Sequence, residues 1–540
     1  MTSTQQFEQQ TKALIDNIKK VCANYGLGND GNEFKVITQV FLYKFLNDKY
    51  VYEIKKIDTK LADTGNWDDV FKTYTDKEIV KLNMRLKPSV ARIRPDHFIT
   101  SLFNKQDKPN FAETFDTTLT DIARDNSDIF SVLTEGGEKI VLFENLSKYV
   151  TDDRDNFCKA IVNKLTGFSF EHIFHEKFDF YATIFEYLIK DYNTNSGGKY
   201  AEYFTPHAVS KIMARCLVKG DINNVTCYDP SAGSGSLLMN LAHQVGEDKC
   251  AIYSQDISQK SSSLLRLNLI LNDLVHSIPN IVKGNTILNP YHKQDNGNLQ
   301  QFDYIVSNPP FKLDFSDFSE DLDSKENHAR FFAGIPKVPP KKKESMAIYL
   351  MFLQHIIYSL KDKGKAAVVV PTGFITAQSG IDKKISQKLV DEKMLAGVIS
   401  MPSNIFANTG TNVSILLIDK ENTEDVVLID ASTLGETVKD GKNQKILLTH
   451  TEEELIINTF NHKEVIDAFS VVVSYEEIEA KNYSLSAGQY FDVKVEYMDI
   501  TQDKFNQKLG AHSSNLGALF NESKKLEGLI QSNLKELNYD

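Results

Sequence analysis

The sequence predicts an α/β protein built around a doubly wound, mostly parallel sheet, with a helical N-terminal domain before it and a helical C-terminal tail after it. From residue 166 to 475, short apolar runs alternate with stretches of helical periodicity, which is the pattern of strand–helix–strand units. Residues 1–165 carry apolar residues at helical spacing and show no strand alternation. Residues 476–540 end in a polar run of helical character. We therefore expect three domains with these limits.

Short runs rich in β-branched residues are the expected strands of the sheet. Two helices are expected among them, at residues 261–271 and 346–360. Ligands of such sheets bind at the carboxyl ends of the strands, so the residues that follow these runs are candidates for the site. The runs are residues 225–228, 251–255, 280–283, 304–307, 366–370, 396–400 and 413–418.

The helical tail carries an apolar stripe within residues 515–537. A helix that cannot bury such a stripe in its own domain often packs on a partner, so we expect a partner-binding tail. Docking back onto this chain is an equal alternative. The stripe consists of Leu516, Leu519, Phe520, Leu526, Leu529, Ile530 and Leu534.

Composition indicates a globular protein in a reducing compartment. Hydrophobic residues make up 41% and charged residues 25% of the 540 positions, as is ordinary for two or three folded domains. No apolar run approaches the ~18 residues of a membrane helix, and the N-terminus lacks the form of a signal peptide. The five cysteines form no Cys-x-x-Cys pair, which argues against a zinc site and a disulfide framework. We expect a cytoplasmic protein without a metal.

The motif Asn308-Pro309-Pro310-Phe311 follows an apolar run and can hold an exocyclic amino group during methyl transfer. The Asn308 oxygen and the Pro309 carbonyl can each accept one N–H, which exposes the nitrogen lone pair as charge develops. Prolines fix φ and lack an N–H, so the turn is stiff and offers no competing donor. Phe311 offers a ring face for an extruded base. Taken alone, the motif is equally well an ordinary Asn-Pro turn.

A glycine-rich turn, residues 228–236, joins an expected strand to an expected helix. Its glycines allow the backbone to approach a ligand closely. The turn matches neither the dinucleotide pattern G-x-G-x-x-G nor a P-loop, and it suits a ligand without phosphates. Asp229 can bind a cationic amino group there, such as the one in S-adenosylmethionine.

A third segment, Tyr203-Phe204-Thr205-Pro206, precedes a run of helical character. Thr205 is a plausible helix cap with Pro206 at the first helical position. By itself this segment indicates only a loop and a capped helix.

In this order and spacing, the three motifs resemble the amino-methyltransferases that make N6-methyladenine in DNA, above all the modification (M) subunit of type I restriction–modification systems. The resemblance covers about residues 170–490. It implies a Rossmann-like sheet that binds S-adenosyl-L-methionine and a catalytic pocket formed by residues 308–311. The residues it assigns to cofactor binding are Tyr203, Phe204, Thr205, Asp229, Ser231, Gly233, Ser234 and Gly235.

Two further residues receive cofactor roles from the resemblance. Asp256 stands where the family has an acidic residue bound to the ribose hydroxyls. Asn285 stands where the family commonly has Asp against the cofactor adenine. Because Asn still offers one acceptor oxygen, we expect binding to survive this departure.

Charge suggests that a partner supplies much of the grip on DNA. The net charge is -12, whereas proteins that bind duplex DNA alone usually present a basic face. The clearest basic cluster is Lys337 with Lys341, Lys342 and Lys343, in a polar segment that we expect to be a mobile loop over the pocket. These lysines either contact DNA phosphates or are merely a solvated run.

The order of the motifs leaves no room for a separate target-recognition domain, and no Walker A sequence is present. Under the resemblance, the partners are double-stranded DNA, a specificity (S) subunit, a second M subunit and a restriction (R) subunit. The chain would methylate adenine N6 after base flipping and would not cleave DNA itself. Alternatives are an amino-methyltransferase acting on cytosine N4, an RNA base or protein glutamine, and a non-catalytic DNA-binding assembly subunit.

Overall fold

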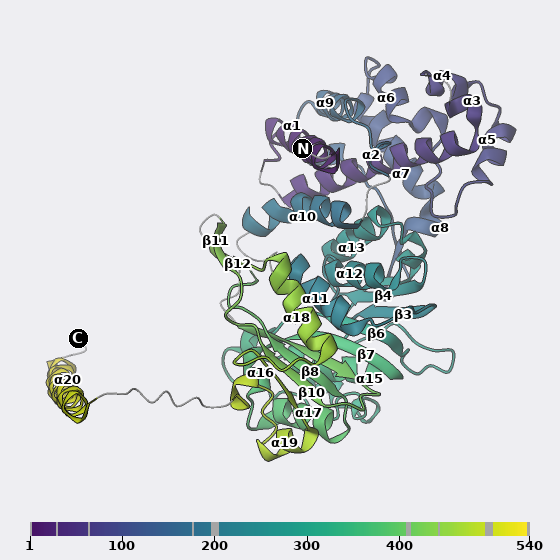
Figure 1. Cartoon of the computed structure of the whole chain (residues 1–540). Coiled ribbons are helices and arrows are strands. Elements are labelled where there is room, and N and C mark those ends of the chain that lie inside the picture. Colours follow the sequence, from purple (N-terminus) through teal and green to yellow (C-terminus); the bar gives the residue numbers. More distant parts are fainter. Residues whose placement is uncertain are drawn as a thin grey trace. The chain divides into compact units, whose positions relative to one another are not determined.

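The computed structural model describes residues 3–28, 31–62, 65–174, 178–195, 205–406, 412–440, 443–491 and 501–536. The chain divides into two compact units, Met1–Phe491 and Asp492–Asp540 (Figure 1). Each unit is described by itself. Tyr203 and Phe204, which the sequence singled out, lie outside the described residues.

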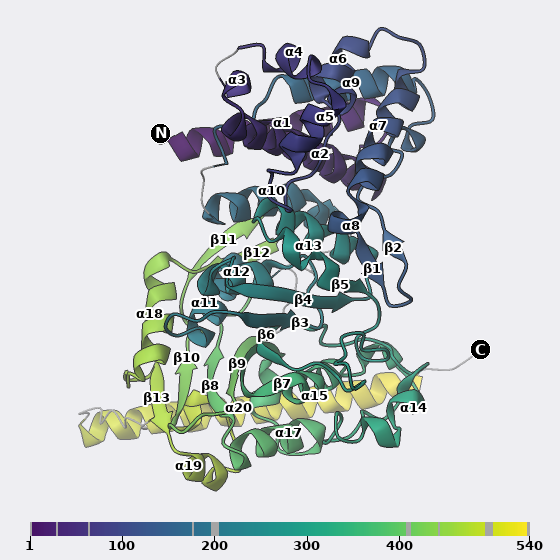
Figure 2. The ribbon, with the colours of Figure 1, turned by 90° about the vertical axis from the view of Figure 1, so that its right-hand side faces the viewer.

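The N-terminal part of the first unit is mostly helical, as predicted. Its helices gather at one end of this unit (Figures 1 and 2). Helix α2 is central because apolar residues on all its sides, such as Phe41 and Tyr50, are buried. The helices are α1 (Ser3–Asn24), α2 (Gly31–Ile57), α3 (Thr59–Ala62), α4 (Trp67–Lys72), α5 (Asp76–Asn83), α6 (Ile99–Lys105), α7 (Phe111–Asp125), α8 (Ser127–Phe130) and α9 (Arg154–Thr166).

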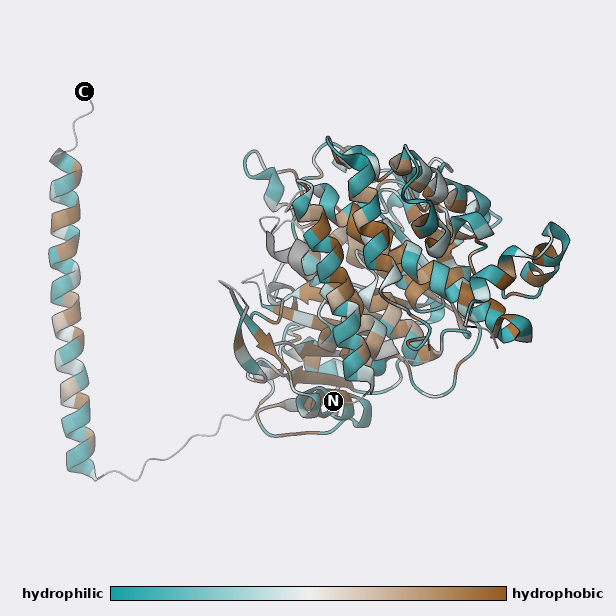
Figure 3. Cartoon of the chain, turned by 90° about the horizontal axis from the view of Figure 1, so that it is seen from above, coloured by the Kyte–Doolittle hydropathy of each residue, from teal (hydrophilic) through white to brown (hydrophobic). Residues whose placement is uncertain are grey.

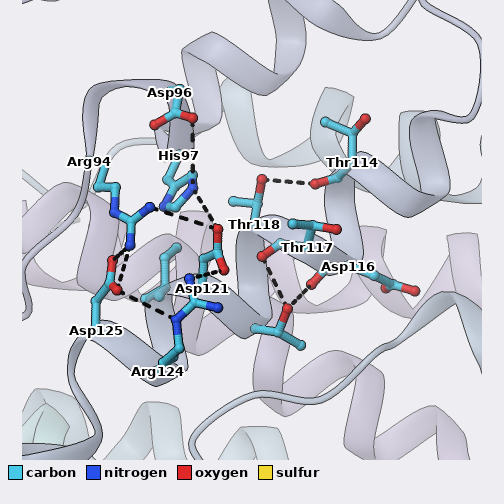
Figure 4. Close-up of polar contacts among 12 residues, drawn as sticks. Arg94, Asp96, His97, Thr114, Asp116, Thr117, Thr118, Asp121, Arg124 and Asp125 are labelled. Carbon is cyan, nitrogen blue, oxygen red and sulfur yellow. Dashed lines mark hydrogen bonds and ion pairs between the residues drawn. The ribbon is translucent and has the colours of Figure 1, made fainter.

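A network of charged side chains ties the segment before α6 to helix α7 (Figure 4). Arg94 donates to Asp125 at 2.6 Å, and the His97 Nε2 lies 3.6 Å from an Asp121 oxygen. Burial lowers the pKa of His97, although the neighbouring aspartates act in the opposite direction.

Within the described residues, eleven strands form one mixed, mostly parallel sheet in the order β13-β10-β8-β9-β7-β6-β3-β4-β5-β1-β2. The chain proceeds from β3 outward to β4 and β5, then returns to β6 on the other side of β3. The strand order therefore reverses between β3 and β6, which is where α/β sheets bind ligands. The strands are β1 (Val132–Thr134), β2 (Lys139–Ile140), β3 (Val225–Asp229), β4 (Cys250–Asp256), β5 (Ile281–Lys283), β6 (Phe302–Ser307), β7 (Leu360–Pro371), β8 (Leu395–Ser400), β9 (Val413–Asp419), β10 (Val426–Asp430) and β13 (Ser470–Val473).

Every strand that the sequence predicted between residues 225 and 418 is present. Strands β1 and β2 were not expected, because a hairpin of three and two residues is too short to show alternation. Strand β1 pairs in parallel with β5, so a hairpin from the N-terminal part extends the sheet. Strand β9 runs antiparallel to β7 and β8.

Helices cover both faces of the sheet, and β7 shows why. Its residues alternate between two cores: Ala367 and Val369 pack with α11, α12 and α13, whereas Val368 and Val370 pack with α15 and α17. The helices of this part are α10 (Phe178–Asn195), α11 (His207–Leu217), α12 (Ser236–Val245), α13 (Gln259–Leu271), α14 (Ser319–Leu322), α15 (Tyr349–Ser359), α16 (Thr372–Ile375), α17 (Gly380–Asp391), α18 (His450–His462) and α19 (Tyr475–Ala480), and a hairpin of β11 (Glu436–Asp440) and β12 (Asn443–Leu447) stands apart from the sheet.

The described part of the second unit is one long helix, α20 (Gln502–Glu536). Apolar residues recur along it between polar ones (Figure 3). The predicted stripe lies on this helix, and Phe505 and Leu509 extend it toward the helix start. A lone helix has no element in its own unit on which to bury such residues.

Candidate active site

A cavity of about 300 Å³ opens at the carboxyl ends of β3, β4 and β6, at the point where the strand order reverses. It brings together residues that the sequence assigned to two different tasks. Those lining it are Thr205, Asp229, Ser231, Gly233, Ser234, Asp256 and Asn285 from the cofactor set, and Asn308 and Pro310 from the catalytic motif.

The glycine turn between β3 and α12 shapes one wall of this cavity. Gly233 and Gly235 have φ of 54° and 83°, in the left-handed region that favours glycine. A Cβ on Gly235 would lie 2.3 Å from the Leu265 Cδ1, so a larger residue would have to displace the Leu265 side chain as well as adopt a positive φ. Gly233 and Ser234 line the cavity, whereas Gly235 belongs to the turn but not to the lining.

Asp229, the last residue of β3, has a buried carboxyl group of which only one oxygen is hydrogen-bonded among the described residues. Its Oδ1 accepts the Ser231 N–H at 2.9 Å, while its Oδ2 has no hydrogen-bond partner among the described residues. Burial raises the pKa of Asp229 to about 7. A cationic group beside this oxygen would stabilise the charged carboxylate, which burial disfavours. The residues present therefore fit the amino group of S-adenosylmethionine.

Asp256, at the end of β4, holds the glycine turn from the neighbouring strand. Its Oδ2 accepts the Gly233 N–H at 3.0 Å, and its Oδ1 accepts the Ser258 N–H at 2.8 Å. Burial raises the pKa of this carboxyl as well. Each oxygen keeps a second lone pair, which suits a carboxylate that also accepts from ribose hydroxyls.

Asn285 uses its side-chain oxygen inside its own turn. The Oδ1 accepts the N–H groups of Ile287 and Leu288, each at 3.1 Å. The backbone N–H of Asn285 donates at 3.0 Å to Glu135, from the β1–β2 hairpin. The oxygen on which the sequence argument relied is thus occupied, and the Nδ2 amide is the polar group that remains.

Asn308 follows β6 and is linked to a segment far away in the sequence. Its Nδ2 donates to the Thr205 Oγ1 at 3.2 Å. The prediction that Thr205 caps α11 is wrong, because the helix begins at His207 and Pro206 occupies the cap position. The Thr205 hydroxyl accepts from Asn308 instead.

Of the three remaining residues of the catalytic motif, one lines the cavity. Pro310 lines it, whereas Pro309 is buried behind it. Phe311 is half-buried, with its ring centroid 6.1 Å from that of Tyr349 in an edge-to-face arrangement. Tyr349 in turn donates to Asp382 of α17, which fixes the ring on which Phe311 rests.

A second wall of the cavity comes from the segment after the motif, which we expected to lie over the pocket as a loop, and from the start of α15. Its lining residues are Lys312, Leu313, Asp314, Phe318, Ile348 and Phe352. The segment packs as a small core in which Phe315, Leu322 and Phe331 are buried. We expected a mobile loop because the segment is polar overall, but its few aromatic residues anchor it. Proximity to the motif was the one available signal for Lys312 to Asp314.

Arg330 anchors this wall to the end of β5. Its side chain is 2% exposed and donates to the carbonyls of Thr286 and Ile287, both at 2.8 Å, and to the Nδ1 of His355 at 3.0 Å. Burial lowers the pKa of Arg330 to about 10. The guanidinium thus donates to two carbonyls and a ring nitrogen, and it links the segment after the motif to the end of β5.

The four lysines predicted to contact DNA are exposed and do not line the cavity. Lys337, Lys341, Lys342 and Lys343 lie in the segment that forms its outer wall. Among the residues that the structure describes, no group of three His, Cys, Asp or Glu side chains could hold a metal ion. In the same residues, every helix is too short or too polar to cross a membrane.

Comparison with known proteins gives a consistent result. A family model described as N-6 DNA Methylase matches residues 176–499, more than half of the chain. The chain is 27% identical to the type I restriction enzyme MpnII methylase subunit of Mycoplasma pneumoniae, over 72% of this chain and 69% of that one. It is 24% identical to the MjaIX methylase subunit of Methanocaldococcus jannaschii, over 99% of this chain and 92% of that one.

The fold has a counterpart among solved structures. The type I restriction–modification methyltransferase subunit from Streptococcus thermophilus superposes with a TM-score of 0.71 at 24% identity, covering 90% of this chain and all of that one. Sheet and helices together define a methyltransferase fold with an added N-terminal helical region and a long C-terminal helix.

The chain belongs to the N-6 DNA methylase family, and within it to the methylase subunits of type I restriction–modification systems. The resemblance inferred from the three motifs is confirmed, as is the prediction of an adenine-specific DNA methyltransferase. The family implies S-adenosylmethionine as the methyl donor.

Proposed function

We propose that this chain is a modification subunit that transfers a methyl group from S-adenosylmethionine to N6 of adenine in duplex DNA, at sites chosen by a separate specificity subunit. One observation carries the proposal. A single cavity contains the amide of Asn308 and, at the end of the adjacent strand, a buried carboxylate oxygen of Asp229 that has no hydrogen-bond partner among the described residues. A cationic donor and a target amino group can therefore meet in one place.

The cofactor lies against the wall formed by the ends of β3, β4 and β5 in this proposal. Asp229 binds the cationic amino group, Asp256 binds the ribose hydroxyls, and the glycine turn lets the backbone approach the ligand. Thr205, Ser231, Ser234 and Asn285 complete this wall. The cofactor, when bound, supplies an electrophilic methyl group.

The target adenine leaves the duplex and enters on the Asn308 side. The Asn308 oxygen and the Pro309 carbonyl accept the two N–H groups, which concentrates electron density on the nitrogen as it attacks. Phe311 stacks on the base, supported by Tyr349. The exposed lysines of the outer wall, Lys337 and Lys341 to Lys343, contact the phosphates beside the flipped base.

Target choice and assembly rest on other chains. With a net charge of -12, this chain needs help to grip DNA. The apolar residues along α20 suit a helix that packs on the specificity subunit. A second M subunit and a restriction subunit complete the assembly that we propose.

The test is transfer of labelled methyl groups to unmodified DNA, by the chain alone and together with the specificity subunit. The proposal expects N6-methyladenine in the digested product only when both proteins are present. Label in another nucleoside, or no label with either preparation, would contradict it. Label with the chain alone would contradict the proposal that target choice resides elsewhere.

A further inference from the structure

The hydrogen bond between Asn308 and Thr205 joins the catalytic motif to a segment 103 residues earlier in the chain. Thr205 is 6% exposed and lines the cavity together with Asn308. The donor is the Nδ2 of Asn308 and the acceptor is the Thr205 hydroxyl oxygen, at 3.2 Å. The Nδ2 end of the Asn308 amide is therefore already hydrogen-bonded.

Orientation of this amide decides what a target base encounters. The two ends of an Asn side chain have nearly the same shape and opposite hydrogen-bonding character. With the oxygen toward the base, Asn308 accepts an N–H of the adenine amino group. With the nitrogen toward the base, two donors face each other, and the lone pair would be drawn away from the methyl group.

We infer that Thr205 is a positioning residue for catalysis: its hydroxyl accepts from Nδ2 and holds the Asn308 amide in place, with the amide oxygen left for the target amino group. This inference rests on the proposed function and gives Thr205 a task in addition to its place in the cofactor wall. The Asn308 side chain is only half-buried and has no other hydrogen bond among the described residues.

The methyl group and the hydroxyl of threonine can be tested separately. Thr205→Val keeps the shape and removes the acceptor, whereas Thr205→Ser keeps the acceptor. In the assembled methyltransferase we expect Thr205→Val to lower the single-turnover rate by roughly tenfold, the scale of one hydrogen bond. The rate of Thr205→Ser should stay near that of the unaltered protein. The rates are compared at saturating cofactor, because Thr205 also belongs to the cofactor wall. Fluorescence of a flipped 2-aminopurine target should change little in both.

A buried threonine hydroxyl elsewhere provides the control. Thr459 on α18 is fully buried, lies outside the cavity lining, and its Oγ1 has no hydrogen-bond partner among the described residues. Thr459→Val should leave the rate unchanged. If Thr205→Val does not fold, as judged by its melting temperature, Thr205→Ala removes the same hydroxyl with a smaller side chain.

A double-mutant cycle separates positioning of Asn308 from general damage. In Asn308→Ala there is no amide for Thr205 to hold. Adding Thr205→Val to Asn308→Ala should then have little further effect on the residual rate. Full turnover by Thr205→Val, or a loss that appears only as weaker cofactor binding, would overturn the inference. Absence of methyl transfer by the unaltered protein would instead overturn the proposed function.

Discussion

The two walls of the cavity are built in different ways. On the wall formed by β3, β4 and β5, most of the polar side chains accept backbone N–H groups two or three residues away, as in the bonds from Ser231 to Asp229 and from Ile287 to Asn285. On the wall formed by Asn308 and the segment after it, the fixing contacts come from distant parts of the chain, such as Thr205 and Arg330. The first wall is thus assembled mostly from local contacts, with the bond from Gly233 to Asp256 as an exception, and the second depends more on tertiary structure.

This difference suggests that the walls have separate tasks and respond separately to mutation. A rigid wall with two buried carboxylates suits a ligand of constant structure, such as the cofactor. A wall held by few long-range bonds suits a substrate that arrives as part of a large, deformed duplex. Variants on the first wall should change binding of the cofactor, and variants on the second should change the rate of methyl transfer.

The largest effect is expected for Asn308→Ala. Loss of the amide removes an acceptor that acts mainly as charge develops on the target nitrogen, and such losses reduce rates by roughly 10²–10³-fold. Single-turnover transfer of labelled methyl groups would measure the rate. Near-normal turnover would show that the catalytic role of Asn308 is wrong.

A smaller loss, confined to binding, is expected for Asp229→Asn. The change keeps the shape and removes the charge that faces the cofactor amino group, and hydrogen bonds to charged groups contribute ~1.5–3 kcal/mol. Calorimetry with S-adenosylhomocysteine should show an affinity lowered by about ten- to a hundredfold. Unchanged affinity would eliminate Asp229 as the partner of the amino group.

Arg330→Met should loosen the second wall and its attachment to the end of β5. The change leaves the carbonyls of Thr286 and Ile287 buried without a donor, at ~1–3 kcal/mol each if no water replaces it. We expect faster hydrogen exchange across residues 314–345 and slower methyl transfer.

Arg266 offers a matched control for Arg330. It is also buried and donates to three carbonyls, those of Phe130, Ile140 and Val141, away from the cavity. Arg266→Met should lower the melting temperature comparably while preserving the methyl-transfer rate of the folded protein. Equal loss of rate in both variants would mean that Arg330 acts only through global stability.

The smallest predicted effect is a pH dependence of the first wall. Asp229 has a pKa near 7 in the ligand-free protein, so below that pH the cofactor amino group must displace a proton. Affinity for S-adenosylhomocysteine should rise from pH 6 to about pH 7.5, and Asp229→Asn should remove this rise. An unaltered slope in the variant would assign the dependence to another group.

The same shift has the opposite sign for stability. Because the folded-state pKa of Asp229 lies above its ordinary value of 3.8, the ligand-free protein loses stability as the pH rises from about 4 to about 7. Thermal unfolding of the ligand-free protein, with Asp229→Asn for comparison, would detect this contribution.

Local chemistry explains which parts were predictable from the sequence. Strands β3 to β9 can be recognised in the sequence as continuous apolar runs. The turn after Asp229 has glycines at the two positions where φ is positive. Both features are complete within a dozen residues. The family resemblance then gave roles to Asp256 and Asn308, each at the end of an expected strand, and the structure brings both to one cavity.

The parts that escaped prediction are those made by long-range contacts. Nothing near Thr205 indicates that its hydroxyl accepts from Asn308, and Arg330 is one of several charged residues in a polar stretch. The β1–β2 hairpin is too short for periodicity to reveal, although it delivers Glu135 to the backbone of Asn285. Within its own turn, Asn285 likewise uses the side-chain oxygen that we expected to be available to the cofactor.

The central claim, that one cavity has a cofactor wall and a separate target wall, is tested most directly by the single-turnover rate at saturating cofactor. Asp229→Asn and Asn308→Ala would be compared in the assembled methyltransferase on the same DNA. The account predicts that excess cofactor restores the rate of Asp229→Asn and does not restore that of Asn308→Ala. Restoration of both rates, or of neither, would contradict the division of the cavity into two walls.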